Sequence, residues 1–236
     1  MKAIIMAGGK GTRLAPYTAV LPKPLMPLGD MPILELILRQ LKQHGVEEVV
    51  LAVNHLSHII RAFFDDGQRL GMNITYSHED YPLGTAGPLG AVIDRMDDHF
   101  FLLNGDLLCN IDFADLYQEH LRSAAGATIA TYEREIKNDF GVLEIDEHQC
   151  LVGYREKPVY KHCVSMGLYV LSKNAVQTLV HPNVYLDMPD LMQNLMQQNK
   201  NVHCYLAKGY WLDIGRPEDY AVAQDLFSSN REMFLK

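Results

Sequence analysis

The sequence predicts an α/β fold: a Rossmann-like, mostly parallel sheet flanked by helices, with a smaller mixed β region. Two observations predict it. Short apolar runs alternate along the 236 residues with segments whose hydrophobic residues recur at helical spacing. The first apolar run, residues 2–7, leads directly into a glycine-rich turn. Sheets of this class bind ligands at such turns, beyond the carboxyl ends of their strands.

The first half of the chain predicts alternating strands and helices. A helix at 32–44 follows from Ile33, Ile37 and Leu41 on one face, with Gly45 as its C-cap. The run at 48–53 is apolar enough for a strand buried on both faces. The remaining expected elements are strands at 2–7, 73–77 and 100–104 and helices at 57–65 and 88–96.

The second half predicts a helix at 113–124, with Asp112 as its N-cap, and a hairpin formed by 141–145 and 150–156. The other expected elements are strands at 127–133, 165–171 and 202–206 and helices at 174–179, 187–198 and 218–227. Because no linker, repeat or low-complexity tract interrupts the chain, we expect one domain over residues 1–236.

Composition excludes several classes of function. The formal charge of −8 argues against an extended nucleic-acid surface, which needs clustered Lys and Arg. The four cysteines are scattered, which favours reduced thiols over a disulfide framework or a zinc site. We expect no signal peptide, and no apolar run reaches the roughly 20 residues that a membrane span requires. We therefore expect a cytoplasmic protein that binds neither nucleic acid nor membrane.

The turn after residues 2–7 has the composition of a phosphate-binding loop. Glycines allow consecutive backbone N–H groups to face an anion, and Arg13 and Lys23 add positive charge. A P-loop is excluded because Gly11, rather than Ser or Thr, follows Lys10. A dinucleotide fingerprint is excluded because Leu14 stands where its third glycine belongs.

The string Gly8-Gly-Lys-Gly-Thr-Arg-Leu14, followed by Pro22-Lys23-Pro24, resembles the signature of the sugar-1-phosphate nucleotidylyltransferases. Further segments resemble that family in order along the chain: Pro82–Gly87, Asn104–Asp106, Phe140–Val142, Glu156–Pro158 and Trp211–Gly215. The resemblance implies synthesis of an NDP-sugar and pyrophosphate from an NTP and a sugar-1-phosphate. Many relatives carry a C-terminal β-helix of hexapeptide repeats, and we expect none here.

The resemblance also implies roles for individual residues. Arg13, Lys23 and Lys157 become the expected catalytic residues, with Lys157 on the sugar phosphate. The expected nucleotide-binding residues are Ala7, Gly8, Gly9, Gly11, Thr12, Glu79, Gly84, Thr85 and Asn104. The expected sugar-phosphate residues are Gly141, Glu156, Lys157 and Gly167. The NTP would then bind within about residues 1–136 and the sugar phosphate within 137–236.

Asp106 and Asp213 are the expected metal ligands. Asp106 follows an apolar strand and a glycine, so its carboxylate should emerge at the carboxyl end of the sheet. The family resemblance places both carboxylates on one Mg²⁺, a cation that prefers such oxygen ligands. An acceptor phosphate is already nucleophilic, which agrees with the lack of a Ser-His-Asp or Cys-His arrangement.

The sequence does not decide which NTP and which acceptor phosphate the protein uses. The segment Pro82–Gly87 most resembles single-domain bacterial mannose-1-phosphate guanylyltransferases, which favours GTP and a mannose-1-phosphate-like acceptor. UTP, dTTP or CTP with another sugar-1-phosphate, or with a phosphocholine-like acceptor, is the alternative, because Ser165 replaces an Asn that many relatives have. A non-catalytic regulatory subunit is a further alternative. A homodimer is the expected assembly if the chain is not a monomer.

Overall fold

The computed structural model describes residues 1–235; Lys236, the last residue of the expected domain, lies outside them. Its centre is a seven-stranded sheet with the strand order β12-β8-β11-β6-β1-β4-β5. The strands are β1 (Lys2–Met6), β4 (Glu48–Val53), β5 (Asn73–His78), β6 (His99–Asn104), β8 (Ala127–Lys137), β11 (Val159–Ser172) and β12 (Val202–Leu206). Strands β5, β4, β1 and β6 are parallel, whereas β11 is antiparallel to β6 and β8. The expected mostly parallel sheet is confirmed.

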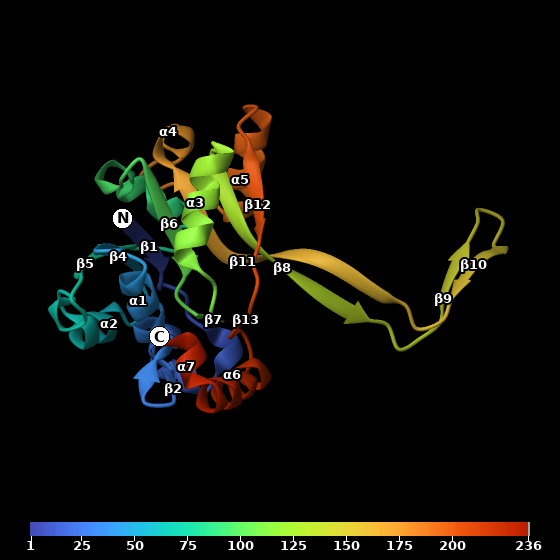
Figure 1. The fold of residues 1–236 in the computed structure, drawn as a ribbon, viewed down its shortest axis with the longest axis horizontal. Coiled ribbons are helices and arrows are strands. Elements are labelled where there is room, and N and C mark those ends of the chain that lie inside the picture. The colour runs from blue at the N-terminus through green and yellow to red at the C-terminus, as the bar shows by residue number, and fades with distance from the viewer. Residues whose placement is uncertain (236) are drawn as a thin grey trace.

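Helices cover both faces of this sheet (Figure 1). One face packs against α1 (Ile33–Gln43), α2 (Ser57–Phe64), α3 (Phe113–Ser123), α6 (Pro217–Ser229) and α7 (Arg231–Phe234). The other packs against α4 (Lys173–Val176) and α5 (Met188–Gln197). Successive strand residues alternate between the two layers: Ile5 and Phe101 belong to the first hydrophobic cluster, and Ile4 and Leu102 to the second. None of the described helices is long and apolar enough to cross a membrane.

The expected helix at 88–96 is wrong. Two 3₁₀ segments, Gly87–Ala91 and Ile93–Arg95, occupy this stretch instead. A Cβ on Gly90 would lie 2.2 Å from the backbone of His181, so the segment packs too closely on its neighbour for a side chain there. Two glycines also weaken an α-helix in this stretch, and tight packing then favours 3₁₀ turns.

Short antiparallel pairs complete the fold. Strand β7 (Leu107–Cys109) pairs with β13 (Trp211–Asp213), so that Asp213 lies opposite Leu107. Strand β2 (Pro27–Leu28) pairs with β3 (Met31–Pro32). The Asp112 carboxylate accepts a hydrogen bond from the Asp115 amide at 3.0 Å, which confirms the expected N-cap of α3.

Strands β8 and β11 are longer than expected, and their outer halves leave the body as a two-stranded ribbon (Figure 1). At the end of this ribbon lies the predicted hairpin, formed by β9 (Val142–Ile145) and β10 (Leu151–Arg155). We call residues 133–164 the arm. In Figure 1 the arm points away from the sheet and its helices, and its tip is the most distant part of the molecule.

Candidate active site

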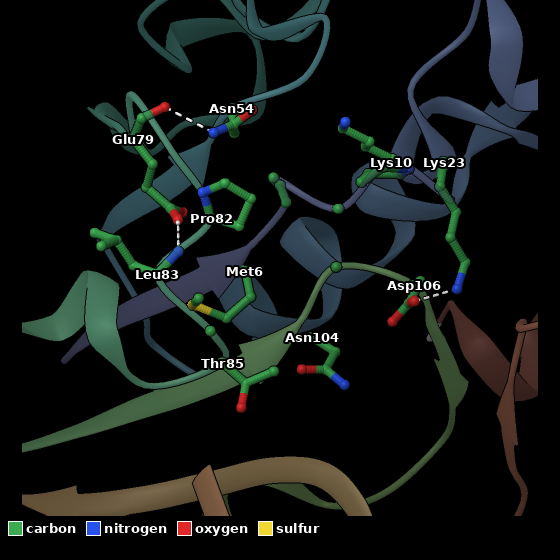
Figure 2. Close-up of a pocket in the computed structure, with 16 residues that line it drawn as sticks. Met6, Lys10, Lys23, Asn54, Glu79, Pro82, Leu83, Thr85, Asn104 and Asp106 are labelled. Carbon is green, nitrogen blue, oxygen red and sulfur yellow. Dashed lines mark hydrogen bonds and ion pairs between the residues drawn. The ribbon is translucent and has the colours of Figure 1, made fainter. Parts of the chain in front are cut away.

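A cavity of about 340 Å³ opens at the carboxyl ends of β1, β4 and β6 (Figure 2). Parallel neighbours end at one edge of a sheet, so loops distant in sequence meet there. Its lining residues are Met6, Ala7, Gly8, Gly9, Lys10, Lys23, Pro24, Asn54, Glu79, Pro82, Leu83, Gly84, Thr85, Asn104, Gly105 and Asp106. Seven of the nine expected nucleotide-binding residues are among them, whereas Gly11 and Thr12 lie farther along the loop.

The glycine-rich loop is held in shape by close packing. A Cβ on Gly8 would lie 3.2 Å from the Asn54 backbone nitrogen, tighter than ordinary contact. Gly11 has φ +61°, a left-handed conformation that favours glycine, and its carbonyl accepts a hydrogen bond from the Thr18 hydroxyl at 2.8 Å. Thr12 then begins a 3₁₀ turn that ends at Leu14. The loop is therefore preformed, with its backbone close to the cavity.

One wall of the cavity is a hydrogen-bonded unit of residues from three loops. The Asn54 amide donates to the Glu79 carbonyl at 2.8 Å, and the Glu79 carboxylate accepts from the Leu83 amide at 3.2 Å (Figure 2). Burial raises the pKa of Glu79 above its usual range. Asp187 accepts from both the amide and the hydroxyl of Thr85, at 2.9 and 3.1 Å. Thr85 is thus positioned by a carboxylate 102 residues farther along the chain.

Lys23 and Asp106 form an ion pair on the opposite wall (Figure 2). Lys23 begins the 3₁₀ segment Lys23–Leu25 and is buried, with 8% exposure. Asp106 follows β6, as its position in the sequence predicts. One of its oxygens, Oδ2, contacts the Lys23 ammonium, while the buried Oδ1 has no hydrogen-bond partner among the described residues. A buried carboxylate oxygen without a partner is costly, and a ligand cation would satisfy it.

Asp213 and Arg13 extend this charged cluster. The pairing of β13 with β7 brings Asp213 beside Asp106, and the Ile214 amide donates to the Asp106 carbonyl at 3.2 Å. Burial, together with the negative charge of Asp106, raises the pKa of Asp213 above its usual range. A Cβ on Gly215 would lie 3.2 Å from the Asp213 carboxylate and 3.3 Å from the Arg13 guanidinium, so both groups flank that glycine.

This cluster fits a hard divalent cation. Two carboxylates on neighbouring strands, one with a free buried oxygen, offer the ligand type that Mg²⁺ prefers. Residues 1–235 contain no group of three or more His, Cys, Asp or Glu side chains that could hold a metal. A cation here would therefore have two protein carboxylates and would keep several waters or substrate oxygens, as Mg²⁺ commonly does.

The expected sugar-phosphate residues do not lie together. Gly167, with φ +73°, lies against Asn104, because a Cβ there would be 2.6 Å from the Asn104 amide nitrogen. Gly141, Glu156 and Lys157 belong to the arm, and Glu156 and Lys157 are exposed. A Cβ on Gly141 would lie 2.4 Å from the Tyr154 hydroxyl, so this glycine allows the hairpin itself to pack closely.

Sequence analysis missed three polar or cationic contributors: Lys10, Asn54 and Asp187. A usable signal existed for Asn54, which follows β4 as Asp106 follows β6. Asp187 had no such signal, because only the close approach of residues 83–87 to 184–187 brings its carboxylate to Thr85.

Comparison with known proteins decides the family. The family model described as Nucleotidyl transferase matches residues 2–229. The chain belongs to this family. That span includes the glycine-rich loop, both aspartates and the whole arm, so each part of the cluster lies within the family's common framework.

Curated relatives act on different bases. Mannose-1-phosphate guanyltransferase of Schizosaccharomyces pombe is 34% identical over 238 residues, covering 98% of this chain and 65% of its own length. UTP–glucose-1-phosphate uridylyltransferase of Synechocystis sp. is 32% identical, covering 93% of this chain and 61% of its own. This chain therefore spans somewhat less than two thirds of these relatives.

Solved structures share the fold over nearly their entire length. HddC from Yersinia pseudotuberculosis has a TM-score of 0.74 at 25% identity, covering 96% of this chain and 99% of its own. A putative glucose-1-phosphate thymidylyltransferase from Bacillus anthracis has a TM-score of 0.77 at 25% identity. It covers 96% of this chain and 94% of its own.

Proposed function

We propose that this chain transfers a nucleotidyl group from an NTP to a sugar-1-phosphate and releases pyrophosphate. The observation that carries the proposal is the charged cluster beside a preformed glycine loop: Lys23 paired with Asp106, whose free oxygen lies buried near Asp213. In the reaction, the acceptor phosphate oxygen attacks the α-phosphorus in line, and the bond to the β-phosphate oxygen breaks. No covalent intermediate is needed, so catalysis depends on positioning and charge neutralisation.

The donor side of the reaction falls to residues of the body. The amides of the glycine loop would bind the triphosphate, as backbone nests bind phosphates elsewhere. Arg13 would hold the β- and γ-phosphates and stabilise the departing pyrophosphate. Lys23 would exchange its contact with Asp106 for the α-phosphate, where charge grows during attack. Gly84 and Thr85, supported by Asp187 and the Glu79 loop, would contact the base.

The acceptor side falls to Lys157, Glu156 and Gly167, with Lys157 on the phosphate and Glu156 on the sugar hydroxyls. This assignment divides the chain near residue 136 into a donor part and an acceptor part within one nucleotidyltransferase domain. Lys157 carries no hydrogen bond or ion pair among residues 1–235, so its ammonium is available to a phosphate.

Asp106 and Asp213 would hold Mg²⁺, and the buried oxygen of Asp106 supports this assignment. When bound, the cation would neutralise charge on the transferring phosphate, which Arg13, Lys23 and Lys157 cannot fully balance. The two carboxylates would position it, with the buried oxygen of Asp106 free to bind it.

We propose GTP as the preferred donor and a mannose-1-phosphate-like acceptor, on the residues Pro82–Gly87. Relatives named for guanylyl and for uridylyl transfer match at similar identity, so the base needs a direct test. The experiment is a matrix of GTP, UTP, dTTP and CTP against several sugar-1-phosphates and phosphocholine, read by pyrophosphate release and product mass. The proposal expects a kcat/KM for GTP above that for each other nucleotide.

Different results of this matrix would overturn different parts of the proposal. A tenfold higher kcat/KM for UTP, dTTP or CTP would overturn the donor assignment alone. Product with phosphocholine but with no sugar phosphate would overturn the acceptor assignment. Nucleotide-sugar binding by calorimetry without pyrophosphate release in any combination would identify a regulatory subunit and overturn the proposed reaction.

A further inference from the structure

The arm has no hydrophobic core of its own. Every residue from 133 to 164 is exposed or only half-buried. Of the nineteen exposed large hydrophobic residues in the described chain, eight belong to these 32 positions: Ile136, Phe140, Leu143, Ile145, Leu151, Val152, Tyr154 and Val159. Two-stranded ribbons are marginally stable in water, and exposed apolar surface of this extent marks interaction sites. The arm therefore needs a surface to cover it.

That surface is not the body from which the arm extends. The hydrogen bonds, ion pairs and ring contacts of residues 133–164 within the described chain all stay inside the arm, as in Lys161–Glu133 and Tyr154–Glu156. The ladder between β8 and β11 continues unbroken from Thr131–Ser165 to Lys137–Val159. These seven residue pairs span about 20 Å along the ribbon. Folding the arm back onto its own pocket would require bending this ladder sharply.

The mouth of the pocket displays matching apolar side chains. Tyr81, Val184 and Tyr185 are exposed beside the residues that line the cavity, and the Leu186 amide donates to the Leu83 carbonyl at 2.9 Å in the same loop pair. Leu206 and Tyr210 are exposed on the segment that leads to Asp213. Exposed apolar residues thus occur on the arm and beside the loops at the mouth of the pocket.

The arm carries the lysine that we assign to the acceptor phosphate. In the pocket, Lys23 is engaged by Asp106 and Arg13 lies beside Asp213, while Lys10 lines the cavity at the glycine loop. Lys157, the residue we assign to the acceptor phosphate, is on the arm with no ion-pair partner among residues 1–235. With that role for Lys157, the pocket of one chain lacks its acceptor lysine until an arm reaches it.

We propose that two copies of this chain exchange arms, so that the arm of each copy covers the pocket of the other and delivers Lys157 there. The exchange rests on the proposed function for the role of Lys157. A reciprocal arrangement uses the same two surfaces twice, as an isologous two-fold dimer requires. It buries the apolar residues of arm and rim together and keeps the β8–β11 ladder intact. Each dimer then has two composite active sites.

The test is complementation between two inactive variants. One carries Lys157→Ala in the arm, and the other carries Asp213→Asn in the pocket; each is purified and shown to unfold cooperatively. Coexpressed with different tags, the two chains form mixed dimers in which one site has an intact pocket and an intact arm. With random pairing, half of the dimers are mixed and have one active site of two, so about a quarter of wild-type activity should return. No recovery in purified mixed dimers overturns the exchange.

The matched control places both substitutions on one chain and mixes it with the wild type. Exchange leaves neither site of the mixed dimer intact, so the purified mixed dimer should be inactive. An arm that serves its own pocket would instead leave one active site, and about half of the wild-type activity would contradict the proposal.

A second measurement needs no activity. Sedimentation of the wild type should give a dimer, and Phe140→Ser with Leu151→Ser should shift it to a monomer. Leu121→Ser, at an exposed apolar residue on α3, is the control and should leave the dimer intact. A wild-type monomer overturns the exchange. A dimer that depends on the arm but has no transferase activity supports the exchange and overturns the proposed function.

Discussion

The pocket and the arm are built on opposite physical principles. Residues of the pocket follow buried strands, so their positions are fixed by a core in which Ile5, Leu102 and their neighbours are fully buried. Residues of the arm follow a solvent-exposed ribbon with no buried side chain between 133 and 164. The difference teaches that a binding residue can be fixed in two ways. One is the packing of its own domain, and the other is a surface that the chain must find elsewhere.

The largest expected contrast between the two regions is in stability. Leu102→Ala in β6 leaves a cavity in the core and should lower the free energy of unfolding by about 2–5 kcal/mol. Leu151→Ala in β10 removes an exposed side chain and should change it by less than about 0.5 kcal/mol in the monomer. Urea denaturation of both variants at low protein concentration measures this. Equal losses would show that the arm packs on the body in solution.

The aspartate pair tests the pocket as a unit. Asp106→Asn and Asp213→Asn should each lower kcat by about 10²-fold or more, because each removes a charge that the proposed cation needs. If the two act together, the double variant should be little worse than the poorer single one. A double variant whose loss is the product of the single losses would contradict the shared site.

The aspartate pair can also be tested by thermal stability, without measuring activity. The folded-state pKa of Asp213 is raised, so its ionisation opposes folding at neutral pH, and Asp213→Asn should raise the melting temperature. Mg²⁺ should stabilise the wild type and have no such effect on the variant, since ligand binding to the folded state raises stability. A Mg²⁺ shift of equal size in both proteins would remove Asp213 from the cation site.

Variants of Lys157 and Lys23 should affect different substrates, the sugar phosphate and the NTP. Lys157→Ala should raise the sugar-phosphate KM and lower kcat/KM by about 10²-fold, with little change in NTP binding, as loss of a charge-assisted contact does. Lys23→Ala should mainly lower kcat. Arg13→Lys keeps the charge but loses the planar fork, so it should also impair activity. Calorimetric titration with a non-hydrolysable NTP checks the assignment: weakened NTP binding by Lys157→Ala alone would contradict it.

The smallest effect concerns pH and is confined to the body. Burial lowers the pKa of His120 to about 4, and its ring contacts His99, Thr128 and Ser172 at 3.0, 2.9 and 3.1 Å. Unfolding frees this ring to bind a proton near pH 6.5. Stability should therefore fall as the pH drops, by about 2 kcal/mol between pH 6.5 and 5.

The matched pair for this effect is His120→Gln and His162→Gln. The first should flatten the dependence of unfolding free energy on pH. The second, on the exposed arm, should leave it unchanged. Thermal unfolding followed across this pH range distinguishes them, and an unchanged slope in His120→Gln would assign the effect to another group.

Much of this molecule could be predicted from local sequence. Periodicity gave β4 and β12 their correct bounds and α1 within one residue, because apolar spacing reports which face is buried. The glycine loop and Asp106 were also predictable, since both directly follow apolar strands. The segment 88–96 was not, because contact with the backbone of His181, far away in sequence, decides its conformation.

The sequence by itself determined the sheet, the loop chemistry and the charged residue types, because these depend on spacing along the chain. Tertiary structure alone decided which charges meet. Pairing of β7 with β13 brings Asp213 beside Asp106, across more than a hundred residues. It also decided that the arm, which carries Glu156 and Lys157, points away from the sheet and its helices (Figure 1). Local patterns record burial and turns, whereas the direction of a ribbon follows from strand pairing and twist over its whole length.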